Sequence, residues 1–163
     1  DPEAIYWFDF WLQRTCQQLA QAIVRDGEGA TKFIEIRVSG THNPADARKI
    51  ADTIATSPLV KTAFYGADAN WGRILAAAGR AGVTLDQSKL SLSIAPLNGD
   101  GAPVQLIAHG EPTGYSEAAA TAIMQGTDIR VDLDCGLAHS DPVVVWTCDL
   151  SHDYVSINGH YRS

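Results

Sequence analysis

The sequence has few cysteines, few basic residues and no long apolar run, and each shortage excludes a class of protein. The three cysteines form no C-x-x-C pair, so the spacing indicates neither a disulfide framework nor a zinc site, and we expect buried free thiols in a reducing compartment. Twelve basic and nineteen acidic residues give a net charge of -7, which argues against a nucleic-acid or anionic-membrane partner. No stretch is apolar enough to span a bilayer, and the first residues lack the basic region of a secretory signal.

Residues 4–24 predict a helix, because apolar side chains recur there every three or four positions. The stripe consists of Ile5, Phe8, Leu12, Cys16, Leu19 and Ile23. Four more aromatic residues widen it, so more than one side of this helix should be covered: Tyr6, Trp7, Phe10 and Trp11. Two interpretations follow, contact with something outside this chain or an internal core helix.

The remaining patterns predict a single domain over residues 1–163, or part of a larger protein, in which strands alternate with helices. Alternating or continuous apolar residues predict strands at 33–39, 90–94, 104–108, 129–133 and 143–146, and a last strand around Val155 and Ile157. The turn at 98–101 makes 104–108 a hairpin partner of 90–94. Asn43 and Ser116 are expected to cap two helices that end before Ser57 and at Gly126. The strands and helices follow no strict βαβ order, so the expected fold class is α/β, a mixed sheet with flanking helices.

The stretch 57–82 holds the densest group of polar and special residues. Pro58 predicts that the preceding helix ends before it, and Asn70 is a good cap for an apolar helix that follows. Asp68, Asn70 and Arg73 should therefore gather at a helix N-terminus, where unpaired N–H groups favour anions. The alternative interpretation is simply a capped helix with a salt bridge.

The stretch 26–32 combines two glycines with a carboxylate. Gly27 and Gly29 allow a sharp turn around Glu28. A phosphate loop is excluded, because the segment lacks the G-K-[ST] order and a preceding strand. The five histidines are scattered without the spacing of metal ligands, so no metal site is expected.

Five segments together resemble the ornithine acetyltransferase (glutamate N-acetyltransferase) family of arginine biosynthesis. They are D-G-E-G-A-T-K at 26–32, S-P-L-V-K-T-A at 57–63, G-A-D-A-N-W-G-R at 66–73, C-D-L at 148–150 and Y-V-S-I-N-G-H-Y-R-S at 154–163. They occur in the family's order and span nearly the whole chain, so the resemblance is specific.

The resemblance implies a fold of the self-cleaving, N-terminal-nucleophile type. In this family a precursor cleaves itself into two chains, and the new N-terminal threonine of the second chain carries acetyl from N-acetylornithine to glutamate. No metal or bound cofactor is expected, although acetyl-CoA is an acetyl donor for some members. The family also implies a cytoplasmic protein in which two-chain units pair into a heterotetramer.

The resemblance also implies roles for particular residues. The Glu28 carboxylate would pair with the amine of ornithine, while Asn158 and Ser163 would hold the amino-acid group of the substrate. Four further motif residues would shape the site without touching the acyl group: Lys61, Asp68, Asn70 and Arg73.

The sequence departs from the family pattern at the nucleophile. The chain begins at Asp1, and no threonine stands in the family's cleavage context, so no catalytic residue is expected here. We expect the C-terminal part of the second chain, inactive alone, which works with the first chain and the missing start of its own. Two alternatives remain: a non-catalytic amino-acid-binding or assembly module, or an amidase or aminopeptidase of the same fold. A threonine encoded before Asp1 would separate the enzyme from the module.

Overall fold

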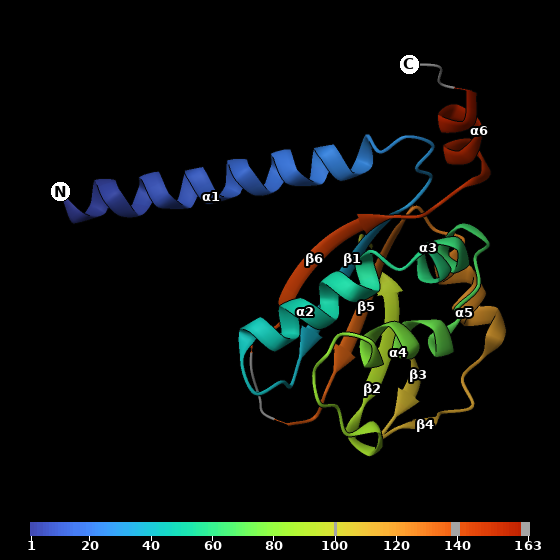
Figure 1. Cartoon of the computed structure of the whole chain (residues 1–163). Helices are drawn as coiled ribbons and strands as arrows, with labels where there is room; N and C mark the ends of the chain where they lie inside the picture. Colours follow the sequence, from blue (N-terminus) through green and yellow to red (C-terminus); the bar gives the residue numbers. More distant parts are fainter. Residues whose placement is uncertain (100, 138–140, 161–163) are drawn as a thin grey trace.

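A six-stranded mixed sheet lies at the centre of the computed structural model, which describes residues 1–99, 101–137 and 141–160 (Figure 1). The strands are β1 (Phe33–Ser39), β2 (Ser91–Pro96), β3 (Val104–Ala108), β4 (Glu111–Pro112), β5 (Asp128–Asp134) and β6 (Val143–Cys148). Their order across the sheet is β4-β3-β2-β5-β1-β6, with β1 and β5 parallel and the other neighbours antiparallel. The structure confirms the predicted α/β class, the β2–β3 hairpin and five predicted strands, which correspond to β1, β2, β3, β5 and β6. Asp100 of the predicted turn lies outside the described residues.

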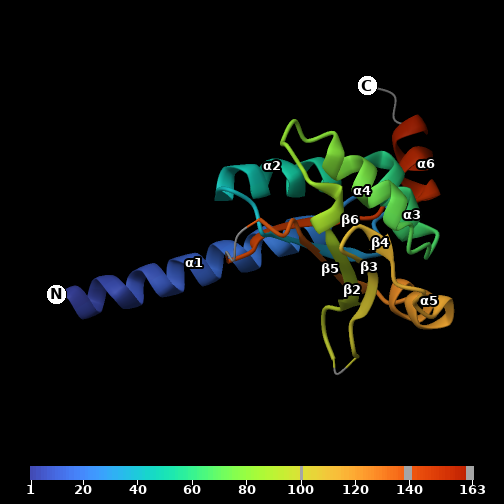
Figure 2. The same cartoon turned by 90° about the horizontal axis from the view of Figure 1, so that it is seen from below.

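The described part of the chain contains six α-helices. They are α1 (Pro2–Arg25), α2 (Pro44–Ala55), α3 (Pro58–Tyr65), α4 (Trp71–Gly79), α5 (Glu117–Met124) and α6 (His152–His160). Figure 2 shows α2, α3 and α4 together on one side of the sheet. The predicted caps of α2 and α5 are confirmed, since the Asn43 side chain accepts from the Asp46 N–H and the Ser116 side chain from the Ala119 N–H. None of these described helices has the length and apolar character needed to cross a membrane.

The core lies between one face of the sheet and helices α2, α3 and α4. Alternate residues of β1 and β5 face this layer and are almost completely buried: Ile34, Ile36, Val38, Ile129, Val131 and Leu133. Helix α2 packs directly on β1 and β6, and α4 packs on α2. Burial of each such side chain contributes about 1.5–3 kcal/mol, so the alternating strands and the striped helix stabilise one another.

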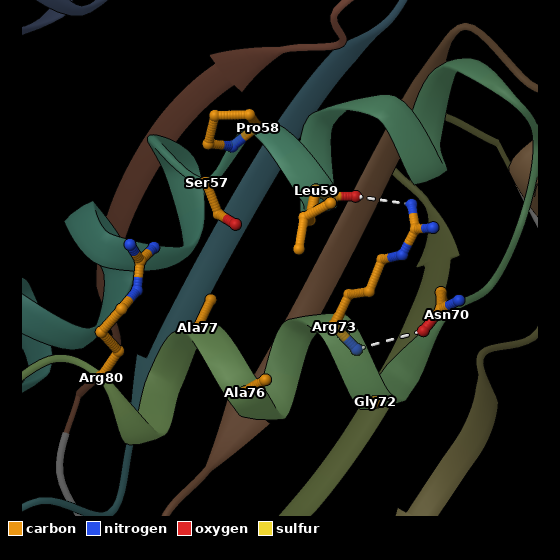
Figure 3. Close-up of a pocket in the computed structure, with 9 residues that line it drawn as sticks. All are labelled: Ser57, Pro58, Leu59, Asn70, Gly72, Arg73, Ala76, Ala77 and Arg80. Atoms are coloured by element: carbon orange, nitrogen blue, oxygen red, sulfur yellow. Dashed lines mark hydrogen bonds between the residues drawn. The ribbon is translucent and has the colours of Figure 1, made fainter.

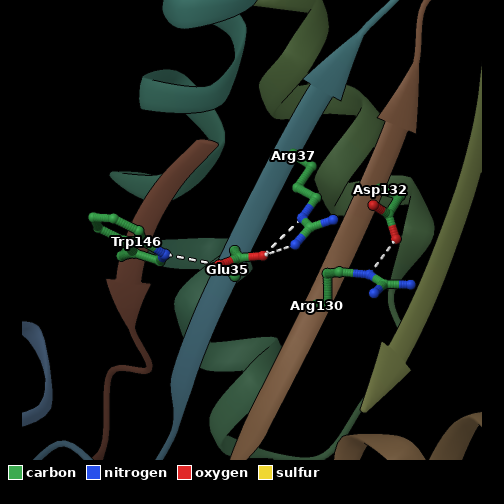
Figure 4. Close-up of polar contacts among 5 residues, drawn as sticks. All are labelled: Glu35, Arg37, Arg130, Asp132 and Trp146. Carbon is green, nitrogen blue, oxygen red and sulfur yellow. Dashed lines mark hydrogen bonds and ion pairs between the residues drawn. The ribbon is translucent and has the colours of Figure 1, made fainter. Parts of the chain in front are cut away.

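The opposite face of the sheet is polar (Figure 4). Glu35 is buried, and its carboxylate accepts hydrogen bonds from Arg37 Nε at 2.7 Å and from Trp146 Nε1 at 2.9 Å. Arg130 Nε donates to Asp132 Oδ2 at 2.8 Å on the neighbouring strand β5. Burying a carboxylate is costly unless it is paired, so these contacts explain how charge is tolerated on this face.

Helix α1 extends away from the sheet (Figure 1), and none of its 24 residues is buried. Its large apolar side chains are 41–74% exposed: Ile5, Tyr6, Trp7, Phe8, Phe10, Trp11, Leu12, Leu19 and Ile23. The predicted helix is confirmed, but the interpretation as an internal core helix is wrong. The expected cover on more than one side is not provided by any described residue of this chain.

Three other expectations need correction. The last segment is helix α6, not a strand, and Val155 and Ile157 are exposed on it. Helix α3 was not predicted, because Pro58 ends one helix and also suits the first position of the next. Of the thiols expected to be buried, Cys135 is buried, whereas Cys148 is half-buried and Cys16 is exposed.

Candidate functional site

Two residues predicted to bind substrate are in direct contact although 130 positions separate them. Asn158 Nδ2 donates a hydrogen bond to Glu28 Oε2 at 2.8 Å and a second to the Tyr154 carbonyl at 2.9 Å. Both side chains are exposed. Glu28 lies in the loop between α1 and β1, and Figure 1 shows α6 standing beside this loop. Neither the second Glu28 oxygen nor the Asn158 amide oxygen has a hydrogen-bond partner among the described residues, so both remain available to a ligand.

Gly29 allows this loop to approach the start of α6. Its φ is +65°, which favours glycine, and an added Cβ would lie 2.7 Å from the Tyr154 nitrogen and 2.9 Å from Ser151 Oγ. Ser151 Oγ donates to the Gly29 carbonyl at 2.6 Å and accepts from the Tyr154 N–H at 3.4 Å. The hydroxyl of Ser151 therefore joins the loop to the first turn of the helix that carries Asn158. Only Gly29 of the two glycines predicted to shape the turn has a positive φ.

Asp149 fixes the other end of the loop. Its carboxylate is buried and accepts from the Thr31 N–H at 2.8 Å, the Lys32 N–H at 2.9 Å and Thr31 Oγ1 at 2.5 Å. A buried carboxylate needs such donors. Because Asp149 directly follows β6, these hydrogen bonds hold the chain just beyond β6 against the loop that leads into β1. Asp149 was missed as a site-forming residue, although it is the central residue of the C-D-L segment.

Lys32 connects the loop to two helices. Its Nζ donates to the Phe64 carbonyl at 2.5 Å and the Met124 carbonyl at 2.6 Å, at the C-terminal ends of α3 and α5. A cation at a helix C-terminus satisfies unpaired carbonyls and complements the helix dipole. Burial lowers the pKa of Lys32, and the nearby Asp149 carboxylate opposes this shift. The last residue of the 26–32 segment therefore has a structural role.

Lys61, predicted to shape the site, lies near the C-terminal end of β6. Its Nζ donates to Thr147 Oγ1 at 3.1 Å and contacts Cys148 Sγ at 3.6 Å, and its carbonyl accepts from the Leu150 N–H. These contacts tie α3 to the segment that continues into α6. Lys61 thus supports the geometry around Glu28 and Asn158 without touching either residue.

Asp68, Asn70 and Arg73 gather at the start of α4, as predicted, but they do not contact Glu28 or Asn158. The Asn70 side chain accepts from the Arg73 N–H at 3.1 Å and donates to Asp68 Oδ2 at 3.0 Å. Arg73 Nη1 donates to the Leu59 carbonyl of α3 at 3.0 Å (Figure 3). The interpretation as a capped helix is therefore confirmed. Within residues 1–99, 101–137 and 141–160, Arg73 and Asp68 form no ion pair, so the suggested salt bridge is not found there.

The remaining expectations about the site concern Ser163 and metal ions. Ser163 lies outside the described residues. Within the described ranges, no group of three or more histidine, cysteine or acidic side chains is arranged to hold a metal ion. The substrate-binding roles of Glu28 and Asn158 stay predictions, now with a hydrogen bond between the two side chains.

Comparison with known proteins gives consistent matches along the chain. The family model described as the ArgJ family matches residues 2–163. A mitochondrial arginine biosynthesis bifunctional protein ArgJ from Candida albicans is 50% identical over 151 residues, covering 90% of this chain and 34% of the relative. The protein of the same name from Postia placenta is 46% identical over 165 residues, covering 100% of this chain and 35% of the relative. The chain thus spans about a third of the length of the curated relatives it matches.

A solved structure agrees with these sequence matches. The crystal structure of arginine biosynthesis bifunctional protein argJ from Bacillus halodurans superposes with a TM-score of 0.86 at 41% identity, covering 99% of this chain and 73% of that one. The family match extends over the segments that hold Glu28, Asp149 and Asn158. This chain belongs to the ArgJ family.

Proposed function

We propose that this chain is the substrate-binding part of an acetyltransferase that moves acetyl from N-acetylornithine to glutamate. The observation that supports this most directly is the hydrogen bond between Glu28 and Asn158, at 2.8 Å. Both residues were assigned to the substrate site by the same family resemblance, and their hydrogen bond supports the proposal because it joins two segments that are distant in the sequence. The relatives' names place them in arginine biosynthesis, which agrees with these substrates.

The chemistry of the two side chains suits an amino-acid substrate. A carboxylate at Glu28 attracts the amine of ornithine, and the Asn158 amide supplies both a donor and an acceptor for the amino-acid group. Contacts of Asp149, Ser151 and Lys32 hold the surrounding backbone, so the pair is ordered before substrate arrives. Such preorganisation reduces the entropy lost on binding.

The reacting group in this proposal is a threonine outside this chain. Its hydroxyl attacks the acetyl carbonyl of N-acetylornithine, and the C–N bond breaks as the ornithine amine takes a proton and leaves. The amine of glutamate then attacks the acetyl-threonine ester, forming N-acetylglutamate and restoring the hydroxyl. This sequence balances without a metal or a bound cofactor. Because the relatives are called bifunctional, we include acetyl-CoA as a second acetyl donor.

The partner in this proposal is the rest of the enzyme, namely a first chain and the start of the second. Helix α1 supports it, because exposed aromatic side chains such as Trp7, Phe8 and Trp11 are suited to an interface. Two-chain units would then pair into a heterotetramer. The cytoplasm was expected as its location, whereas the names of the fungal relatives say mitochondrial; fractionation of the source cells would decide between them.

The test is acetyl transfer from N-acetylornithine to glutamate by the native assembly carrying Glu28→Gln. Loss of one charge-assisted contact should lower kcat/KM about 10- to 100-fold. Glutamine still accepts a hydrogen bond from Asn158, so folding should be preserved. Glu111→Gln, an exposed carboxylate on β4, is the matched control and should leave the rate unchanged.

Intact mass and N-terminal sequencing of every polypeptide in the same preparation complete the test. A chain that begins with threonine and gains 42 mass units (about the mass of one acetyl group) on incubation with N-acetylornithine supports the proposal. Unchanged transfer by Glu28→Gln would remove Glu28 from the site. A preparation without any threonine-initiated chain would favour the non-catalytic binding module.

A further inference from the structure

A groove of about 540 Å³ runs between α3 and α4, away from the contact between Glu28 and Asn158 (Figure 3). Its middle is apolar and formed by Leu59, Ala76 and Ala77. Polar groups lie toward its ends, with Ser57 and Arg80 at one and Arg73 at the other (Figure 3). Nothing in the proposed acetyl transfer uses this groove, so its role is a separate question.

Ser57 is the unusual residue of this groove. It precedes the first residue of α3 and is 5% exposed, yet its side chain makes no capping hydrogen bond. Figure 3 shows the hydroxyl pointing into the groove, toward α4. It has no hydrogen-bond partner anywhere in the described part of the chain. Pro58, the first residue of α3, has no N–H, and the Lys61 N–H donates to the Ser57 carbonyl, so the Ser57 hydroxyl is the unused donor identified at this end of the groove.

Two guanidinium groups lie along the same groove. Arg73 lies on α4, and Arg80 directly follows the last residue of α4, Gly79. Seven residues of helical rise separate their Cα atoms by about 10 Å. Arg73 uses Nη1 on Leu59 and Thr62, and its Nε and Nη2 have no hydrogen-bond partner in the described ranges. Arg80 forms no ion pair with a described residue. In a chain of net charge -7, this local pair of cations favours an anionic ligand.

We propose that the groove binds a small dicarboxylate whose acid groups are separated by a short aliphatic chain. One carboxylate pairs with Arg80 and the Ser57 hydroxyl, and the second pairs with the free nitrogens of Arg73. The aliphatic chain lies on Leu59, Ala76 and Ala77. Guanidinium groups match the planar geometry of carboxylates, and the apolar middle excludes ligands with polar centres.

The experiment is calorimetric titration of the native assembly with glutarate, which has five carbons and no amine to be acetylated. Butyrate, with one carboxylate at the same ionic strength, should bind at least tenfold more weakly, because one charge-assisted contact is missing. Arg80→Gln should weaken glutarate binding about tenfold, and Ser57→Ala several-fold. Arg48→Gln on α2, whose guanidinium pairs with Asp52, is the control and should change nothing.

Three results would overturn the proposal. Butyrate binding as tightly as glutarate would exclude recognition of two acid groups. Glutarate binding lost in Glu28→Gln but kept in Arg80→Gln would place the ligand at the substrate site. Dissociation of the assembly by Arg80→Gln, seen by light scattering, would make the groove a protein interface. Because the groove residues Ser57 and Arg80 do not contact Glu28 or Asn158, either proposal can fail without the other.

Discussion

Helices α1 and α2 carry the same sequence signals but differ in burial: α2 packs into the core and α1 does not. Each starts with a polar cap followed by proline, and each repeats apolar residues every three or four positions. Five of the 12 residues of α2 are buried, whereas none of the 24 residues of α1 is buried. The apolar repeat therefore predicts that a helix face needs cover, but not which part of the protein supplies the cover.

The difference depends on which strands lie against each helix. Helix α2 packs on β1, the strand that precedes it in the chain, and on β6. After α1, the turn around Gly29 directs the chain into the sheet, and only the last turns of α1 stay near it (Figure 1). An exposed apolar surface as large as that of α1 marks an interaction site rather than an ordinary surface.

The largest effect is expected from Ile50→Ala in α2. Ile50 is completely buried, and its truncation should lower the free energy of unfolding by about 2–5 kcal/mol through lost burial and a cavity. Ile5→Ala in α1 makes the same chemical change at a position that is 62% exposed, so it should change the chain's stability by less than about 0.5 kcal/mol. Urea unfolding followed by circular dichroism measures both values.

The same pair of variants in the native assembly tests whether α1 is covered there. A cost for Ile5→Ala that approaches the cost for Ile50→Ala would show that a partner buries this face. An unchanged assembly would contradict the proposed interface and leave α1 as a solvated extension. The two results therefore distinguish an interface on the apolar stripe of α1 from a stripe that stays exposed to solvent.

A second comparison concerns two serines that precede helices of equal length. Ser116 accepts a hydrogen bond from the Ala119 N–H at 3.3 Å at the start of α5, whereas Ser57 makes no such contact at α3. Ser116→Ala should therefore lower the free energy of unfolding by about 1 kcal/mol. Ser57→Ala should be nearly neutral, although each serine directly precedes its helix.

Thermal and urea unfolding of the two variants, measured side by side, checks this expectation. A loss for Ser57→Ala equal to that for Ser116→Ala would show that the Ser57 hydroxyl caps α3 in solution. The groove would then lose its unused donor, and the dicarboxylate proposal would lose its main support.

Much of the fold could be predicted from local pattern, because alternation and capping are local effects. The strand of Ile34, Ile36 and Val38 and the helix capped by Asn43 are two examples. Where local signals are ambiguous, the prediction failed. Val155 and Ile157 are two positions apart, a spacing compatible with a strand, yet contacts such as Ser156 Oγ to the His152 carbonyl belong to a helix.

Less of the candidate site could be predicted, because its contacts join distant segments. Glu28 and Asn158 were singled out through resemblance to a family, and no local pattern indicated that they touch. Asp149 binds Thr31, 118 positions away, and nothing around either residue predicts this. Lys32 likewise reaches carbonyls of two helices whose positions depend on the whole fold.

The smallest effect is expected where α1 joins the sheet. Arg25, the last residue of α1, donates to Asp128 at the start of β5, and this hydrogen bond holds the pKa of Asp128 below its usual range. A lowered pKa means that the folded state favours the carboxylate. The pair therefore stabilises the fold above about pH 4, the usual range of an unfolded aspartate, and the contribution is lost as pH falls through the lowered value.

Asp128→Asn should lower the free energy of unfolding at pH 7 by less than about 1 kcal/mol, because the Arg25 side chain is 44% exposed and water screens the pair. Urea unfolding at pH 7 and at pH 2 measures the difference, which should shrink at the lower pH, where the wild-type carboxylate is being protonated. Asp52→Asn, which breaks an exposed pair with Arg48 within α2, is the control at about 0.3–0.5 kcal/mol. A loss for Asp128→Asn that stays the same at both pH values would show that the contact acts through shape rather than charge, and that α1 is anchored to the sheet by packing alone.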